Sequence, residues 1–328
     1  MTNFVRYALE NGGDVQPLIV PSEIMTPGGL FNPSILLDTD GKIVVNVRHC
    51  QYTLYHAEKQ RFEHHFGPLV YVHPENDVTL TTTNYLGVLN QDLQMSKVLK
   101  VDTNKLDVEP IWTFVGLEDV RITRWDDKLF YTGVRRDTTK NGQGRMELSE
   151  IEMTPKNAKE ISRQRIPILE NTNSYCEKNW MPIIDQPYRY VKWCNPTEVV
   201  EYDPVSKKLH QVYCSKERVN IQYDLRGGSQ VIPFGNHYIA LTHITMMHPS
   251  VTKRKNATYR HAFVIWDKNW KVIKYGKMFS FLDHLIEFAC GMATVGNDIL
   301  ITFGTQDNSA YVLKIPVESF TKFVEEVV

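Results

Sequence analysis

The sequence predicts an all-β protein that folds as a five-bladed β-propeller with a short C-terminal helix. Five segments share one pattern: small or polar residues, an apolar strand, a turn, and a second apolar strand that ends in polar groups. At least one further strand follows most of these segments. Short strands repeated in this way fit blades arranged around an axis better than two packed sheets, and a β-sandwich is the second choice.

The repeats follow an N-terminal arm. Residues 1–27 are short apolar pieces interrupted by glycine and proline, which predicts an arm that lies on the body of the protein. The five repeats are marked by inner-hairpin turns at Asp40-Gly41, Asp126-Asp127, Gln186-Pro187, Gly235-Asn236 and Gly296-Asn297. We expect the propeller to span residues 28–315, with an insertion of about residues 66–110 in its longest step.

The tail is the one clear helical pattern. Within residues 316–328, the apolar side chains of Phe320, Phe323, Val324 and Val327 fall on one face of a helix. We expect this helix to pack against the propeller without taking part in chemistry.

Composition narrows the class of protein. The 328 residues are 42% hydrophobic and carry a formal net charge of −1, so no overall field attracts nucleic acid, although a modified nucleic acid remains open as an acceptor. The five cysteines are scattered without a CxxC pair, which indicates free thiols instead of a disulfide framework or a zinc site. With no apolar leader and no membrane-length stretch, we expect a cytoplasmic protein without a membrane partner.

Polar residues near the ends of the repeated strands are expected to meet at the propeller axis. Carboxylates can act as acid or base, and several cations together suit a phosphate group. The converging set is Asn32, Arg48, Glu118, Asp119, Arg121, Arg135, Lys178, Asn179, His243 and Asp307. The competing structural interpretation is a salt bridge between Arg121 and one of the two neighbouring carboxylates.

The same residues resemble a known family. Phe31-Asn32-Pro33-Ser34-Ile35, Gly116-Leu117-Glu118-Asp119-Val120-Arg121-Ile122, Lys178, His243 and Phe303-Gly304-Thr305-Gln306-Asp307 are similar to the β-mannoside phosphorylase family, and the resemblance spans residues 28–315. It implies a five-bladed propeller. It also implies that Asp119 is the catalytic acid or base, that Arg48, Arg121, Lys178 and His243 hold sugar or phosphate, and that Asp307 holds sugar hydroxyls.

The remaining site residues complete this hypothesis. We expect Glu118 to pair with an arginine and orient Asp119. Arg135 or Arg136 is expected to join the phosphate group, and Asn32 and Asn179 are expected to contact sugar.

Departures from the family pattern favour a divergent branch. The family usually has proline where this chain has Val120, and the segment Cys176-Glu177-Lys178-Asn179-Trp180 differs from the phosphorylase form. We therefore favour an inverting glycosyltransferase that moves sugar from a nucleotide-sugar donor to a hydroxyl acceptor. Asp126-Asp127 is a hairpin turn and no other metal-binding pair stands at a strand end, so this transferase would need no metal and no cofactor.

Two other functions remain open. A glycoside phosphorylase or hydrolase would use the same residues, with the cations holding inorganic phosphate. A non-catalytic sugar-binding propeller would instead offer tryptophan faces for stacking, for which the candidates are Trp112, Trp125, Trp180 and Trp193. The sequence does not identify the sugar or the acceptor.

Overall fold

The computed structural model describes residues 2–56, 69–72, 79–170, 172–216, 218–221, 223–249 and 257–326. Strands dominate this part of the chain, and its α-helices are α1 (Phe4–Glu10) and α2 (Val317–Glu326). The all-β prediction is therefore confirmed. Neither helix has the length and apolar character required to cross a membrane.

Antiparallel runs of neighbouring strands make up the sheets. The first two runs are β3 (Gly29–Leu37), β4 (Ile43–Cys50), β7 (Leu80–Leu89) and β8 (Met95–Asp102), then β10 (Glu118–Trp125), β11 (Lys128–Arg135), β12 (Arg145–Met153) and β13 (Ala158–Arg165). A short parallel contact between β8 and β13 joins them into one nine-stranded sheet. The third run is β14 (Met181–Pro182), β15 (Arg189–Cys194), β16 (Thr197–Asp203) and β17 (Lys208–Cys214).

The last two runs use the C-terminal third of the chain together with a strand near the N-terminus. In the fourth, β18 (Arg226–Gly227) and β19 (Ile232–Phe234) both pair with β20 (His237–Met247), which is followed by β21 (Ala257–Trp266), β22 (Val272–Tyr275) and β23 (Phe279–Ser280). In the fifth, β24 (Glu287–Val295), β25 (Asp298–Thr305) and β26 (Ser309–Pro316) continue into β2 (Asp14–Pro17). Minor elements are β1 (Thr2–Asn3), β5 (Thr53–His56), β6 (Leu69–Val72), β9 (Phe114–Val115) and the 3-10 turns Ser22–Ile24 and Lys140–Gly142.

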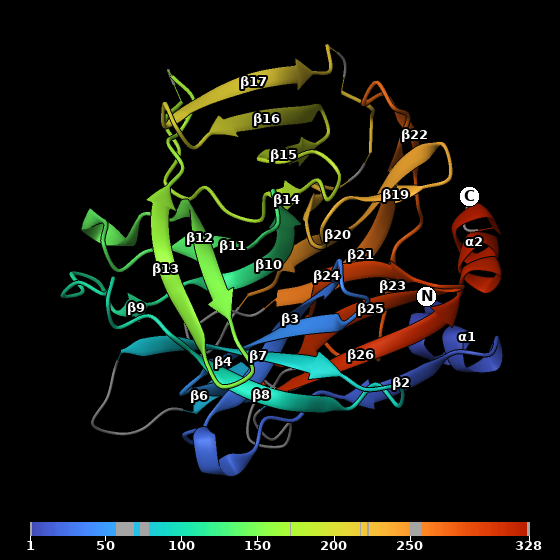
Figure 1. The fold of residues 1–328 in the computed structure, drawn as a ribbon. Helices are drawn as coiled ribbons and strands as arrows, with labels where there is room; N and C mark the ends of the chain where they lie inside the picture. Colours follow the sequence, from blue (N-terminus) through green and yellow to red (C-terminus); the bar gives the residue numbers. More distant parts are fainter. Residues whose placement is uncertain are drawn as a thin grey trace.

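The sheets surround a common centre, where their first strands lie (Figure 1). Strand β3 contacts β10 and β24, and β10 also contacts β14. The fully buried side chain of Gln230 ties these strands together. Its amide donates hydrogen bonds of 2.8 Å to the carbonyl oxygens of Ile35 and Ile122, while its side-chain oxygen accepts one of 3.1 Å from Met292 N.

The two ends of the chain pack against each other at one edge of the molecule (Figure 1). Phe320, Phe323 and Val324 of α2 are buried as predicted, and Val327 lies outside the described residues. The predicted arm contains a helix that the sequence did not suggest. It begins at Asn3, whose side chain accepts a hydrogen bond from Arg6 N, and Phe4 lies 4.6 Å from Phe323 between ring centroids. Strand β2 then completes the last sheet on β26.

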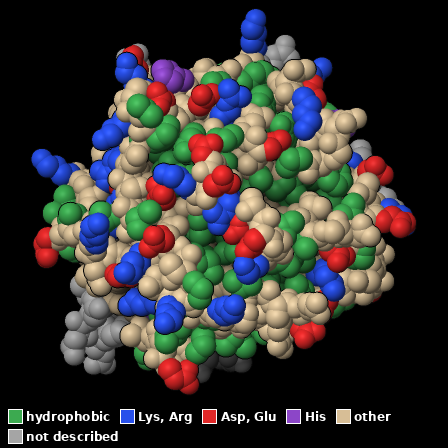
Figure 2. Space-filling model, viewed as in Figure 1, with side chains coloured by type: hydrophobic (Ala, Val, Ile, Leu, Met, Phe, Trp, Pro, Cys, Tyr) green, Lys and Arg blue, Asp and Glu red, His purple; other side chains and the backbone are tan. Residues whose placement is uncertain are grey.

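The predicted insertion at residues 66–110 consists largely of regular strands. Strand β7 pairs with β4 from Thr82 to Leu89, and β8 pairs with β7, so both belong to the first sheet. The additional chain lies between β4 and β7 and includes the β5–β6 hairpin. In the surface view of Figure 2, Lys and Arg side chains are interspersed with Asp and Glu, in agreement with the near-zero net charge.

Candidate active site

A β-bulge recurs at the same point of the innermost strands. The pairing register shifts between Phe31 and Ser34 in β3 and between Glu118 and Arg121 in β10. Within these bulges, Asn32 and Asp119 have φ angles of 47° and 51°, a left-handed conformation that redirects a side chain out of the regular alternation. As a result, Asn32 Nδ2 donates a hydrogen bond of 2.8 Å to Asp119 Oδ1 across 87 residues of sequence.

One arginine holds both neighbouring carboxylates. Arg48 reaches from β4 and lies 2.8 Å from Asp119 Oδ1 through one terminal nitrogen and 3.5 Å from Glu118 Oε2 through the other. Its Nε donates to Thr82 Oγ1 at 3.2 Å. Glu118 Oε1 has a distant cation, Arg136, whose Nε lies 3.7 Å away. Asp119 is therefore the firmly bound carboxylate of the pair, and Glu118 is the loosely bound one.

The environments of the two carboxylates move their pKa values in opposite directions. Burial raises the pKa of Glu118, and the nearby negative charge of Asp119 adds to this effect while Arg48 opposes it. Burial acts on Asp119 in the same sense, but Arg48, Arg121 and the hydrogen bond from Asn32 outweigh it and hold the Asp119 pKa well below its usual range. Of the two groups, Glu118 is thus the one that can carry a proton closer to neutral pH.

Arg121 fixes backbone instead of pairing with a carboxylate. The residue is buried, and its guanidinium donates to the carbonyl oxygens of Gly228 at 2.8 Å and Asp119 at 2.6 Å. Its remaining nitrogen donates to Asn179 Oδ1 at 3.3 Å and lies 3.5 Å from Gly227 O. Among the described residues it forms no salt bridge, so the predicted structural bridge to Glu118 or Asp119 is absent from this part of the chain. Arg121 therefore joins three inner segments through its hydrogen bonds and not through an ion pair.

His243 lies beside this arginine and stays neutral. Its Nδ1 is 3.0 Å from Gly227 O, and because a carbonyl only accepts, Nδ1 must carry the hydrogen and Nε2 the lone pair. Its ring stacks on Tyr259 at 5.7 Å between centroids. Burial lowers the pKa of His243 well below its usual value, and the positive charges of Lys178 and Arg121 lower it further. At neutral pH, Nε2 is therefore a hydrogen-bond acceptor.

Lys178 supplies a positive charge that is open to solvent. It precedes Asn179, a buried residue in the left-handed conformation with φ of 62°. Its charge acts on Glu118, Asp119 and His243, which places it at the same site. Within the described residues, Lys178 takes part in no hydrogen bond or salt bridge. It can therefore bind an anionic group without first breaking an ion pair.

Asp307 is linked to Arg48 through Tyr52. Its Oδ2 accepts a hydrogen bond of 2.9 Å from the hydroxyl of Tyr52, and Tyr52 in turn contributes to the electrostatic environment of Arg48. Gln306 and Asp307 both have left-handed backbone conformations, with φ of 55° and 47°. The predicted sugar-binding carboxylate thus belongs to the same cluster through Tyr52, a residue that the sequence analysis did not name.

Arg135 is the predicted site residue that lies apart from the cluster. Its guanidinium is buried and paired with Glu147 at 2.7 Å and Asp137 at 3.0 Å. Arg136 is the one that approaches Glu118, so the phosphate role predicted for one of the two arginines can fall only to Arg136. Arg226, which pairs with His243 across β18 and β20, is a further cation near the site that the sequence analysis missed. The Arg-Gly-Gly segment before a strand was its only signal.

The tryptophans suggested for sugar stacking differ in exposure, and the cysteines are free thiols as predicted. Trp125 and Trp180 are buried core residues, whereas Trp112 and Trp193 are partly exposed. All five cysteines are free, and burial raises the pKa of the Cys290 thiol to about 12, so this thiol stays protonated at neutral pH. Across the described ranges, no three His, Cys, Asp or Glu side chains are grouped as ligands for a metal ion.

Comparison with known proteins gives structural neighbours only. No protein-family model matches the sequence. No curated protein matches it either. Among solved structures, the fold is similar to the β-1,2-mannobiose phosphorylase from Listeria innocua, with a TM-score of 0.54 and 14% identity over 95% of this chain and 97% of the other.

Two further neighbours extend this similarity. The mannose phosphorylase MPT-4 from Leishmania mexicana, solved with a phosphate ion, has a TM-score of 0.53 and 11% identity over 97% of this chain and 93% of the other. A putative glycosidase from Bacteroides thetaiotaomicron has a TM-score of 0.57 and 13% identity over 92% and 97% of the two chains. The resemblance to the β-mannoside phosphorylase family is confirmed at the level of the fold, and membership of its transferase-like branch stays a prediction.

Proposed function

We propose that the protein is a five-bladed β-propeller enzyme that cleaves a glycosidic bond with inorganic phosphate, as a glycoside phosphorylase does. Five antiparallel runs, each beginning with a strand at the centre, support the blade count. The names of the structural neighbours support a β-mannoside as the substrate class. A hydrolase would differ in using water where the phosphorylase uses phosphate.

The observation that carries this proposal is a carboxylic acid with a raised pKa beside an excess of positive charge. The centre holds the two carboxylates Glu118 and Asp119 among the cations Arg48, Arg121, Arg136 and Lys178. The cluster therefore has more positive than negative charges, which favours binding of an anion. A sugar-binding protein without catalysis would have no need for an acid with a raised pKa next to an anion site.

Each group has a role in a direct displacement. An oxygen of phosphate, held by Lys178 with Arg226 and His243 nearby, attacks the anomeric carbon of the sugar. The bond from that carbon to the glycosidic oxygen breaks, and Glu118 transfers its proton to the leaving oxygen. A single displacement inverts the anomeric centre and yields a sugar 1-phosphate. We assign to Asp307, Asn32 and Asn179 the task of holding the hydroxyls of the transferred sugar.

This assignment exchanges the roles that the sequence suggested for the two carboxylates. Asp119 is bound by Arg48 and Asn32, and its lowered pKa keeps it ionised. We assign it the task of orienting Arg48 and stabilising positive charge that develops on the sugar. Glu118, with its raised pKa, becomes the general acid.

Transfer from a nucleotide sugar ranks second. The same cations would suit a diphosphate, but the compared structures are named as phosphorylases or glycosidases, and none is named as a nucleotide-sugar transferase. The preference formed from the sequence is therefore not supported by these neighbours.

Titration with inorganic phosphate tests the anion site. We expect the wild-type protein to bind phosphate and Lys178→Ala to bind it at least about tenfold more weakly, the effect of about 1.4 kcal/mol. Lys156→Ala is the control and should leave phosphate binding unchanged. Lys156 is also an exposed lysine, but it lies in the turn between β12 and β13. Absence of phosphate binding, or equal affinity of the Lys178 variant, would contradict the phosphorylase proposal.

A further inference from the structure

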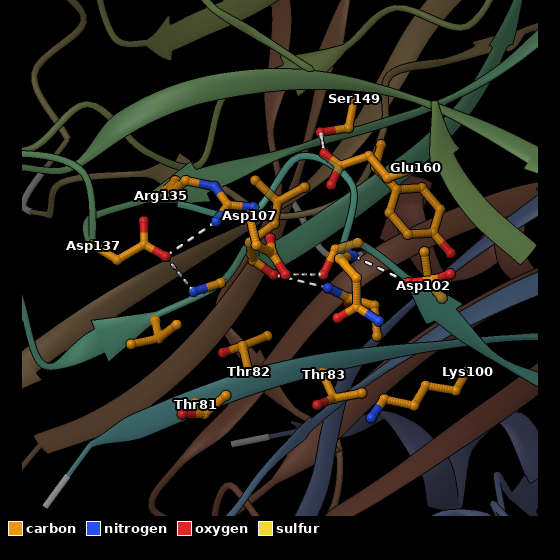
Figure 3. Close-up of a pocket in the computed structure, with 18 of the residues that line it drawn as sticks. Thr81, Thr82, Thr83, Lys100, Asp102, Asp107, Arg135, Asp137, Ser149 and Glu160 are labelled. Atoms are coloured by element: carbon orange, nitrogen blue, oxygen red, sulfur yellow. Dashed lines mark hydrogen bonds and ion pairs between the residues drawn. The ribbon is translucent and has the colours of Figure 1, made fainter. Parts of the chain in front are cut away.

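A cavity outside the central site lies between the first two runs of strands. It has a volume of about 640 Å³ and lies between β7 and β8 on one side and β11, β12 and β13 on the other. Figure 3 shows Thr81, Thr82 and Thr83 on one wall, Arg135 and Asp137 on a second, and Ser149 and Glu160 on a third. This volume falls within the range of roughly 300–1,000 Å³ that is usual for small-molecule sites.

The cavity is adjacent to the centre but is not part of it. Thr82 lines the cavity and also accepts the hydrogen bond from Arg48 Nε. Gly116 and Leu117 line it just before Glu118, and Gly116 N donates to Asp137 Oδ2 at 2.8 Å. The wall that separates the two sites is therefore the segment that leads into the candidate acid.

Two buried polar atoms at this cavity lack partners. Tyr131 is 1% exposed and Asp137 is 3% exposed, and both side chains line the cavity. The Tyr131 hydroxyl and Asp137 Oδ1 have no hydrogen-bond partner among the described residues. A buried polar atom that stays unsatisfied costs about 1–3 kcal/mol, so a donor and an acceptor without partners in residues that line one cavity favour a polar occupant of that cavity.

The charges around the cavity are largely paired, which disfavours an ionic ligand. Arg135 lies 3.0 Å from Asp137, and Arg163 pairs with Asp107 at 3.0 Å and with Glu160. A phosphate would meet the nearby carboxylates, and a cation would meet the two arginines. A neutral molecule with both donors and acceptors suits such a surface best.

Part of the cavity wall is apolar. Val101, Val115, Leu117 and Ile151 lie among the polar residues of the wall. Saccharides present hydroxyl groups at their edges and C–H groups on their faces, and the mixed lining matches this division. We propose that this cavity is a second binding site for a neutral polyhydroxylated ligand, a saccharide of one or two units. The inference does not depend on the reaction proposed for the centre.

Calorimetric titration with methyl β-D-mannoside, methyl β-D-glucoside and myo-inositol tests the site on the full chain. We expect at least one of these probes to bind. Thr83→Phe, which places a ring in the cavity, should weaken that binding at least tenfold, and Tyr131→Phe should weaken it about threefold to tenfold. Tyr190→Phe is the matched control, because Tyr190 is as deeply buried as Tyr131 but does not line the cavity.

The central site provides the second control. Lys178→Ala should leave binding of the probe at the cavity unchanged. Failure of all three probes to bind, or equal binding by wild type and Thr83→Phe, would overturn the proposal. Binding that is lost in Lys178→Ala but kept in Thr83→Phe would also overturn it, because that result would assign the ligand to the centre. If Thr83→Phe does not fold, as judged by thermal unfolding, the comparison of Tyr131→Phe with Tyr190→Phe decides the question.

Discussion

Arg48 and Asp119 form a largely buried ion pair of 2.8 Å between residues 71 positions apart in sequence. Because the pair joins β4 to the bulge in β10, it holds the first two runs of strands together at the point where the candidate chemistry takes place. The same arginine lies 3.5 Å from Glu118 Oε2. It therefore binds the two neighbouring carboxylates unequally, Asp119 tightly and Glu118 loosely.

Removal of Arg48 should destabilise the protein strongly. We expect Arg48→Met to lower the free energy of unfolding by about 3–5 kcal/mol, since Asp119 would remain buried without its counter-charge. Denaturant unfolding at pH 7 measures this change. In the double variant with Asp119→Asn the loss should be smaller than the sum of the two single losses. Strict additivity would show that the two side chains do not interact.

The stability contributed by Asp119 should depend on pH. Because folding lowers the pKa of Asp119 below its ordinary value of 3.8, its contribution to stability is present above that value and is lost as the pH falls below it. Asp119→Asn should therefore be less stable than wild type by about 3 kcal/mol at pH 7. The difference should shrink in unfolding measurements at pH 3 and pH 2. A difference independent of pH would contradict the lowered pKa.

Glu118→Gln should separate stability from catalysis. Burial raises the pKa of Glu118, so the stability that its protonated form contributes is lost as the pH rises through the folded-state pKa. We expect the variant to unfold at pH 7 within about 0.5 kcal/mol of wild type and to lose activity by about two to four orders of magnitude. The pH dependence of the wild-type rate should show an ionisation above pH 4.5, and this ionisation should be absent from the pH–rate profile of the variant. Retention of that ionisation in Glu118→Gln and its loss in Asp119→Asn would return the acid role to Asp119.

The side chain of Gln230 should be essential for the assembly of the centre. Gln230→Leu leaves Ile35 O, Ile122 O and Met292 N without the partner that now serves all three. At about 1–3 kcal/mol for each buried unsatisfied group, we expect a loss of about 3 kcal/mol or more in the free energy of unfolding. Gln211→Leu on the exposed face of β17 should change it by no more than about 0.5 kcal/mol. Similar stability of the two variants would show that the bridge is not needed.

The repeated strands could be predicted from the sequence because the pattern that specifies a strand and its turn lies within a few neighbouring residues. Alternating apolar residues, turn residues and polar strand ends repeat in each unit, and the structure brings Asn32, Asp119, Asn179 and His243 together around Arg121 or Arg48. The bulges that turn Asn32 and Asp119 toward each other have no comparably clear local signal, since the left-handed conformation of an Asn or Asp is common in many turns.

The remaining features depend on contacts between distant residues. Arg135 and Arg136 are adjacent at the end of β11, and the alternation of a strand sends one to Glu147 and the other toward Glu118. Helix α1 has only seven residues, and its Phe4 packs against Phe323 near the opposite end of the chain. The unequal pKa values of Glu118 and Asp119 arise from Arg48, so adjacency in sequence could not assign their roles.

Detection of a sugar 1-phosphate tests the central claim most directly. The full-length protein would be incubated with β-1,2-mannobiose and inorganic phosphate, and the products followed by phosphorus NMR. We expect a new phosphate-monoester resonance that appears only when both substrates are present. In Glu118→Gln the rate at which this product forms should be about two to four orders of magnitude lower. Free mannose formed at the same rate without phosphate would contradict phosphorolysis and indicate hydrolysis. A panel of other β-linked disaccharides that also gave no phosphate ester would contradict the proposed reaction as a whole.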